Sequence, residues 1–220
     1  GGKTLVQIKD AMWRFEVKQP RTIVVVAPRL LLANQLCSDF LEHVDNANVL
    51  HVHSGDTKHF KTTKADRINL FVSMCHTVRE HVIIFTTYHS LHRIVESGID
   101  IDTIYFDEAH NSVQRHFFKS TDVLSKKADR AFFFTATRKT SAVTNKPGMN
   151  WVDTYGQVIA RVSAPELVDG GYILPPQVKV IDMDKHPVKA CTPLIDAQNV
   201  LTSIDDMGLK KILVCVKTTK

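Results

Sequence analysis

Short apolar runs rich in β-branched residues alternate along the chain with segments in which apolar residues recur every three or four positions. Strands buried on both faces of a parallel sheet form continuous apolar runs, whereas an amphipathic helix repeats its apolar residues with a period of about 3.6. The alternation therefore predicts an α/β fold in which helices flank a parallel sheet. The predicted strands cover residues 22–27, 48–53, 82–85, 104–106 and 130–134.

The helical pattern near the start of the chain places Leu5, Ile8, Met12 and Phe15 on one face of a predicted helix over residues 3–18. Pro20 ends this helix, because proline cannot donate the hydrogen bond that would continue it. Further helices are predicted over residues 28–41 and 65–75, through residues 94–95, and around residues 113–118.

The periodicity changes in the last third of the chain. A short strand over residues 158–162 and a short helix over 164–167 are predicted before a segment, 169–176, that contains two adjacent glycines and two adjacent prolines. A strand over 177–183, a helix over 193–207 and a strand over 211–216 follow. We therefore expect a first domain at 1–163, a linker at 164–176 and the start of a second domain at 177–220.

Two adjacent carboxylates, Asp107 and Glu108, follow the predicted strand 104–106 directly. Open α/β sheets bind their ligands at the carboxyl ends of the strands. Uncompensated charge is costly at the end of a buried strand, and a magnesium ion would supply the compensation. Asp107 can hold Mg²⁺ directly or through water, and Glu108 can orient an attacking water. A pair of solvated acids at a strand end is the alternative.

The chain opens with Gly1, Gly2, Lys3 and Thr4, which match the end of the phosphate-loop pattern G-x-x-x-x-G-K-[ST]. In that loop, backbone N–H groups cradle the phosphates of ATP, the lysine reaches the β- and γ-phosphates, and the hydroxyl binds Mg²⁺. A flexible glycine-rich terminus is the alternative. The order of the two signals, phosphate loop first and acidic strand end later, predicts an ATPase that uses ATP and Mg²⁺.

This pair of motifs resembles the superfamily 2 helicases and translocases, which are DEAD/DEAH-box-like ATP-driven motors. The segments APRLLLANQ, TTYHSL and TAT are also similar to motifs of this group, the second of them to the helicase subunits of type I and type III restriction enzymes. The resemblance implies a P-loop RecA-like domain followed by the start of a second RecA-like domain. It implies catalytic roles for Lys3, Glu108 and His110.

The resemblance also implies contacts with nucleic acid. Arg29 and Thr87 would bind sugar–phosphate oxygens, which positions the strand without reading its sequence. Helix capping is the alternative for Thr87, and capping or solvation is the alternative for Arg29. Thr135 and Thr137, in TAT, would couple the state of ATP to the grip on nucleic acid, with His110 bonding toward one of them. Arg138 stands where the family often has proline.

The function predicted from these features is that of an ATP-dependent helicase or translocase, with DNA favoured over RNA and with partner subunits of a larger complex. A non-catalytic, nucleotide-switched nucleic-acid-binding module and a P-loop kinase are the alternatives. The intact Glu108 argues against the switch, and no acceptor-binding segment or lid supports the kinase. Because the chain begins inside the phosphate loop, we expect an internal fragment that is inactive alone.

Composition bears on the binding partner and on the cellular compartment of the protein. The formal net charge of +5 fits a polyanionic partner without requiring one. The four cysteines are scattered, with no C-x-x-C pair, which indicates reduced thiols in a cytoplasmic protein. No apolar run approaches the length of a membrane-spanning helix. His51 and His53 alternate onto one face of a predicted strand, and since no further metal ligand is evident, they are interpreted as ordinary strand residues.

Overall fold

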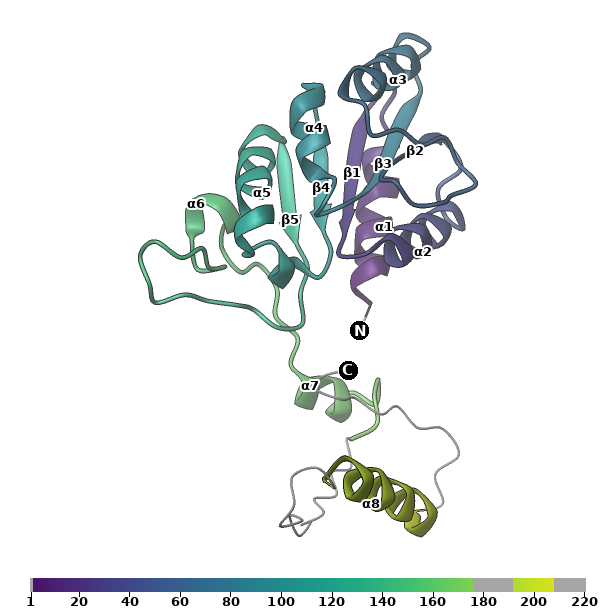
Figure 1. Ribbon diagram of the computed structural model, residues 1–220. Coiled ribbons are helices and arrows are strands. Elements are labelled where there is room, and N and C mark those ends of the chain that lie inside the picture. The colour runs from purple at the N-terminus through teal and green to yellow at the C-terminus, as the bar shows by residue number, and fades with distance from the viewer. Residues whose placement is uncertain (1, 176–191, 208–220) are drawn as a thin grey trace. The chain divides into compact units, whose positions relative to one another are not determined.

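The computed structural model describes residues 2–175 and 192–207, and the chain divides into two compact units, Gly1–Ile159 and Ala160–Lys220. The first unit contains a five-stranded sheet in which the strand order is β2-β3-β1-β4-β5 and every pairing is parallel (Figure 1). The predicted α/β fold is thus confirmed. The strands are β1 (Thr22–Ala27), β2 (Ala47–Val52), β3 (His81–Thr87), β4 (Thr103–Phe106) and β5 (Arg130–Phe133).

Helices cover both faces of this sheet (Figure 1). Alternate residues of the central strand β1 serve the two faces: Val24 and Val26 belong to one buried cluster, and Ile23 and Val25 belong to the other. The helices of the first unit are α1 (Lys3–Arg14), α2 (Leu30–Leu41), α3 (Ala65–Thr77), α4 (Leu91–Ser97), the 3₁₀ turn η1 (Ala109–Asn111), α5 (Arg115–Lys127) and α6 (Val152–Tyr155).

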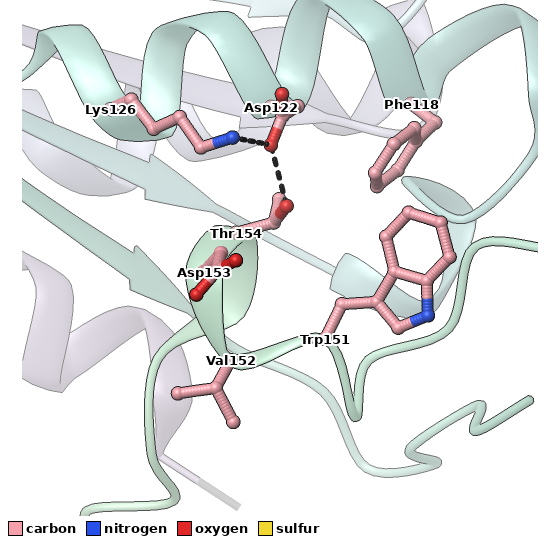
Figure 2. A pocket seen from close by; sticks show the side chains of 7 residues that line it. All are labelled: Phe118, Asp122, Lys126, Trp151, Val152, Asp153 and Thr154. Atoms are coloured by element: carbon pink, nitrogen blue, oxygen red, sulfur yellow. Dashed lines mark hydrogen bonds and ion pairs between the residues drawn. The ribbon is translucent and has the colours of Figure 1, made fainter. Parts of the chain in front are cut away.

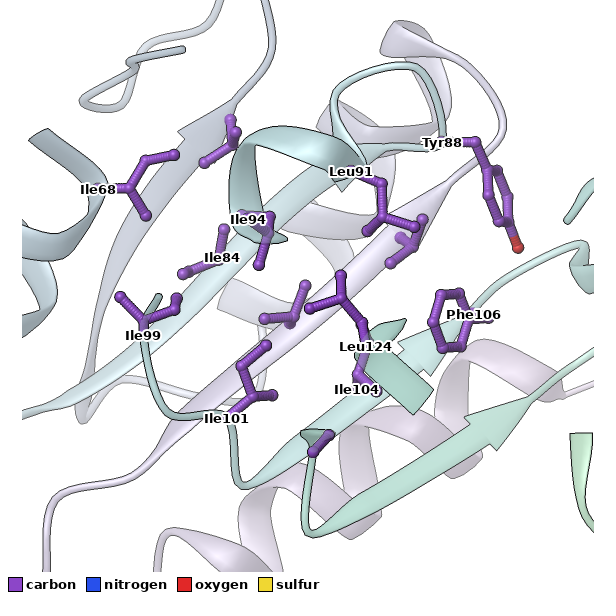
Figure 3. Close-up of a cluster of buried hydrophobic side chains, with 14 of the residues drawn as sticks. Ile68, Ile84, Tyr88, Leu91, Ile94, Ile99, Ile101, Ile104, Phe106 and Leu124 are labelled. Carbon is purple, nitrogen blue, oxygen red and sulfur yellow. The ribbon is translucent and has the colours of Figure 1, made fainter. Parts of the chain in front are cut away.

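The two buried clusters fix which helices lie on which face. Helices α1 and α2 contribute Ile8, Ala11 and Phe40 to the cluster that contains Ile23. The cluster on the opposite face takes its helical residues from α3, α4, α5, η1 and α6. Figure 3 shows part of it, including Ile84 of β3 and Ile104 and Phe106 of β4. Because parallel strands are covered on both faces, β1 and β3 are buried along their whole length.

Most element boundaries agree with the sequence-based predictions to within a few residues. One predicted element is wrong: residues 158–162 form no strand. Val158 and Val162 are 59% and 66% exposed, and no strand of the described residues pairs with this segment. A short apolar run alone does not make a strand, because its backbone groups also need a partner.

The second unit is described in part. Helix α7 (Ala164–Asp169) begins with a capping box, in which Ser163 Oγ accepts from the Glu166 N–H and the Glu166 carboxylate accepts from the Ser163 N–H. Helix α8 covers Thr192–Met207, as predicted. The strands expected at 177–183 and 211–216 lie outside the described residues, so the second domain and the boundaries of both domains stay predictions. Within the described ranges, no helix is long and apolar enough to cross a membrane.

Candidate active site

The acidic pair lies at the carboxyl end of β4, as predicted. The Asp107 N–H still donates to the Val26 carbonyl of β1 at 2.9 Å, and the next residue leaves the sheet. Glu108 takes the left-handed conformation, with φ 44° and ψ 51°. This conformation costs a non-glycine residue about 1–3 kcal/mol and persists where the surrounding structure holds it. The turn therefore directs the two adjacent carboxylates differently.

The N-terminus of α1 meets this strand end. Lys3 Nζ donates to Glu108 Oε1 at 2.6 Å, which joins residues 105 positions apart, and both side chains are about one-third exposed. Gly2 precedes the helix in the left-handed region (φ 72°), no side chain caps the first turn, and no acidic residue lies in it. The free N–H groups and the helix dipole make this end of α1 suitable for an anion.

Asp107 is nearly buried, with 9% of its surface exposed. Its Oδ1 accepts from Gln7 Nε2 at 3.4 Å, and its main-chain carbonyl accepts from the Tyr88 hydroxyl at 2.9 Å. Burial raises the pKa of the Asp107 carboxyl above its usual value, although the nearby charge of Lys3 acts in the opposite direction. Gln7 Oε1 is buried without a hydrogen-bond partner among the described residues. A carboxylate and a free amide oxygen side by side suit a hydrated Mg²⁺.

His110 connects the acidic pair to the loop that follows β5. Its Nδ1 lies 3.0 Å from Thr135 Oγ1, 3.4 Å from Thr137 Oγ1 and 3.3 Å from Glu108 Oε2. The Thr137 N–H in turn donates to Thr135 Oγ1 at 3.1 Å. The contacts expected between His110 and these threonines are thus present, and their coupling role stays a prediction.

Thr4 and Gly1 are the remaining residues of the predicted phosphate loop. Thr4 is half-buried in the first turn of α1, and its hydroxyl has no hydrogen-bond partner among residues 2–175 and 192–207. Gly1 lies outside the described residues. The hydroxyl of Thr4 is therefore available to a ligand, which fits the role predicted for it.

Arg29 and Thr87 lie at the carboxyl ends of neighbouring strands, since Thr87 is the last residue of β3 and is in register with Ala27, the last residue of β1. Arg29 is exposed and its side chain does not cap α2, so capping is excluded and solvation remains as its alternative. Thr87 is 4% exposed, and α4 begins after Ser90 without any side-chain cap. The capping alternative for Thr87 is therefore wrong, and its phosphate contact stays a prediction.

The loop after TAT takes its course from Arg138, the residue that stands in the place of the family's proline. The guanidinium donates twice to the main-chain carbonyl of Met149, at 2.8 and 3.3 Å. This arginine therefore closes the polar loop onto the segment before α6 and points toward a carbonyl rather than toward Glu108.

Sequence reasoning missed two residues of the site, Gln7 and Tyr88. Gln7 lies one helical turn after Lys3, so the i,i+4 spacing on α1 could have placed both on one face. Tyr88 stands beside Thr87 in TTYHSL and stacks on Phe106, with ring centroids 6.3 Å apart. Its partner, a main-chain carbonyl of another strand, carries no signal in the sequence.

A recess between α5 and the segment around α6 lies apart from these residues, and Figure 2 shows it. Lys126 donates to Asp122 at 2.7 Å, Thr154 donates to the same carboxylate at 2.6 Å, and Trp151 packs edge-on against Phe118. Through these contacts Asp122 joins α5 to α6. It is lined by Phe118, Asp122, Lys126, Trp151, Val152, Asp153 and Thr154.

Comparison with known proteins agrees with this arrangement. Residues 1–140 match the family described as the res subunit of type III restriction enzymes. A nuclease-deletion mutant of the Type ISP restriction-modification enzyme LlaGI, in complex with a DNA substrate mimic, is similar in structure (TM-score 0.64, 22% identity). The ATP-dependent Type ISP enzyme LlaBIII, bound to DNA, is similar too (TM-score 0.60, 20% identity).

Each likeness covers 77% of this chain but only 15% of the LlaGI chain and 14% of the LlaBIII chain. At these identities the likeness is one of fold, and it confirms the predicted RecA-like class for the sheet and its helices. No curated protein sequence matches the chain.

Proposed function

The chain belongs to the family of type III restriction enzyme res subunits, and from this premise we propose that it carries the ATP-binding half of a motor that moves along DNA. The family is helicase-like, which supports a function of the helicase or ATPase type in general. The observation that supports the finer proposal is the ion pair between Lys3 and Glu108. It brings the phosphate-loop lysine and the acid of the strand end to one place, 2.6 Å apart.

In this proposal the N-terminus of α1 binds the phosphates of ATP. The uncapped N–H groups of the first turn would donate to the phosphate oxygens, Lys3 would add its positive charge, and Thr4 and Asp107 would hold Mg²⁺. Gln7 contributes its free amide oxygen to the water around the metal. When bound, Mg²⁺ neutralises the charge that develops on the phosphates during transfer to water.

Glu108 positions water and accepts its proton. Lys3 and His110 hold its two carboxylate oxygens, Oε1 and Oε2. Phosphate groups at the start of α1 would compete for Lys3, and this competition would free Oε1 while His110 still orients Oε2. The acid is thereby available when the nucleotide is present, and the arrangement ties hydrolysis to occupancy of the phosphate site.

Nucleic acid would bind at the edge that carries Arg29 and Thr87. Both lie at the carboxyl ends of neighbouring strands in the sheet that holds the acidic pair, and LlaGI and LlaBIII, which share the fold, are described with DNA. Residues Thr135 and Thr137, which contact His110, are the proposed coupling between the two sites. The domain limits at 163 and 177, and partner subunits, belong to the same proposal.

The test is phosphate release by the chain and by the chain extended at both ends, each with and without DNA and RNA. We expect DNA-stimulated release from the extended protein and none from the chain alone. Lys3→Ala should weaken ATP–Mg²⁺ binding roughly 10- to 100-fold, because a hydrogen bond to a charged group contributes about 1.5–3 kcal/mol. Lys9→Ala, on the exposed side of the same helix, is the matched control.

Near-normal turnover by Lys3→Ala would contradict the phosphate-loop assignment. Transfer of the phosphate to an acceptor other than water would favour the kinase alternative. Nucleotide-dependent binding of DNA without any hydrolysis by the extended protein would favour the non-catalytic switch.

A further inference from the structure

Three potential metal ligands from separate segments converge behind the sheet, on the face covered by α1 and α2. Cys37 Sγ from α2 and one ring nitrogen each from His51 of β2 and His59 of the following loop lie within 4.8 Å of one another. In the sequence, no further ligand is evident beside His51 and His53. The fold supplies two, because α2 packs Cys37 against β2 and the loop after β2 passes beside that strand.

The unpaired ring nitrogen of His51 is the main evidence for a ligand at this cluster. Its side chain is fully buried, and Nε2 has no hydrogen-bond partner among the described residues. A buried polar atom without a hydrogen-bond partner costs folding free energy, and a bound ligand would offset that cost. His51 Nδ1 lies 2.8 Å from His53 Nε2, which leaves Nε2 as the nitrogen available to a metal. Metal-binding histidines commonly hold their second nitrogen in such a contact, which fixes the ring.

The loop that carries His59 is held in place by main-chain contacts. The His51 N–H donates to the Phe60 carbonyl at 2.9 Å, and the Thr62 N–H donates to the His51 carbonyl at 3.0 Å. Asn34 of α2 donates to the Asp56 carbonyl at 2.9 Å from the other side. The ring centroids of His51 and His59 are 5.6 Å apart. His59 is thus placed by the backbone, while its exposed side chain can adjust to a ligand.

From this geometry we propose that Cys37, His51 and His59 bind a zinc ion, with His53 positioning His51 and a water completing a tetrahedral site. Thiolate and imidazole are ligands that suit Zn²⁺. Bonds of about 2.0–2.3 Å place tetrahedral ligands roughly 3.5 Å apart, so the cluster closes with small side-chain movements. The ion would fasten the loop after β2 to α2, and it lies outside the proposed ATP site.

Burial shifts the pKa values of the two buried ligands, His51 and Cys37, in opposite directions. It lowers the pKa of His51 to about 4, so the ring is neutral and its lone pair is available at pH 7. It raises the pKa of the Cys37 thiol to about 11, so Cys37 is protonated without a metal. Zinc binding therefore forms a Zn–S bond and releases the thiol proton to solvent.

The test is titration of the chelator-treated chain with Zn²⁺ in competition with a chelating indicator. We expect one zinc per chain, and His59→Ala should weaken binding at least 10-fold, because even changes to residues that only support a ligand cost about 10–100-fold. His116→Ala, an exposed histidine on α5, is the matched control and should bind like the wild type. Both replaced side chains are exposed, so folding should be kept.

Cobalt(II) gives a second readout, because a thiolate bound to it produces a charge-transfer absorption. The absorption should appear in the wild type, disappear in Cys37→Ala and persist in Cys75→Ala, which replaces the buried cysteine of α3. A wild type that binds no zinc stoichiometrically would overturn the proposal. So would a His59→Ala variant of unchanged affinity, or a cobalt–thiolate absorption that survives in Cys37→Ala.

Discussion

Replacing Tyr88 by phenylalanine tests whether the hydroxyl of this residue, which follows β3, holds the main chain of Asp107 in place. Tyr88 is 2% exposed, and its hydroxyl donates to the main-chain carbonyl of Asp107 at 2.9 Å. The ring would keep its packing in Tyr88→Phe, so the change removes one hydrogen bond and leaves a buried carbonyl without a donor. Such a loss costs about 1–3 kcal/mol.

The stability assay is thermal or urea unfolding of the chain. For 150–250 residues, each kcal/mol lowers Tm by roughly 2–4 °C. The matched control is Tyr105→Phe, a buried tyrosine of β4 whose hydroxyl donates to Asp10 at 2.6 Å. Asp10 keeps both hydrogen bonds from Arg14 and is partly exposed, so we expect a smaller cost of about 0.5–1.5 kcal/mol.

The two variants should differ more clearly in nucleotide binding. Tyr88→Phe frees the carbonyl next to Glu108, which is held in a left-handed conformation, so the acidic pair should lose its position and ATP–Mg²⁺ binding should weaken. Tyr105→Phe removes a hydrogen bond to Asp10 on the opposite face of the sheet and should leave binding unchanged. Unfolding of Tyr88→Phe at the wild-type temperature would contradict the stabilising role of this hydrogen bond. Equal loss of nucleotide affinity in both variants would contradict its specific role at the acidic pair.

Three further predictions concern the charges of the site. Glu108→Gln should keep ATP–Mg²⁺ affinity or raise it up to roughly 5-fold, since a partly exposed ion pair with Lys3 is worth about 0.2–1 kcal/mol. Phosphate release should fall by about 10²–10⁴ in the extended protein, and lost affinity with normal turnover would refute the role. Asp107→Asn should stabilise the metal-free chain by about 0.5–2 kcal/mol at neutral pH. The folded pKa of Asp107 is raised, so its stabilising contribution is present below its unfolded pKa and is lost as pH rises through the folded pKa. Unfolding measured from acid to neutral pH should show this divergence, and parallel curves would contradict it. Arg29→Ala should reduce the salt dependence of DNA binding by about one unit of slope, measured with labelled strands, and the double variant with Thr87→Ala should bind more weakly still. Unchanged binding by the double variant would count against the interface.

The sheet could be predicted because its physics is local. Residues 22–27 and 82–85 are continuous apolar runs, and only strands covered on both faces bury such runs completely. The strand-end site followed from the same pattern, since Asp107 and Glu108 come directly after one run and ligands bind where parallel strands end. The contact between His110 and Thr135 was expected from the family resemblance of the two motifs and not from local spacing, because the residues lie far apart in the sequence.

The rest depends on which strands are neighbours, and the sequence does not state that order. Tyr88 follows β3 and Asp107 follows β4. Only β1 separates these two strands in the sheet, so the tyrosine side chain can reach the carbonyl of Asp107. Cys37 and His59 approach His51 only after α2 and the loop after β2 have packed against the same strand. The strand wrongly predicted at 158–162 shows the converse, because a local pattern without a neighbour stays exposed.

The pairing of Lys3 with one of two acids leaves an electrostatic imbalance that a ligand can relieve. Lys3 neutralises Glu108 at 2.6 Å, whereas Asp107 is more deeply buried and has the amide of Gln7 as its side-chain donor. Burial therefore raises the pKa of Asp107, which means that folding opposes its ionised form. A divalent cation beside Asp107 would reverse that balance, and the free oxygen of Gln7 would gain a partner in the metal's water. Binding of Mg²⁺ at the proposed site would therefore recover free energy that is lost on burying Asp107.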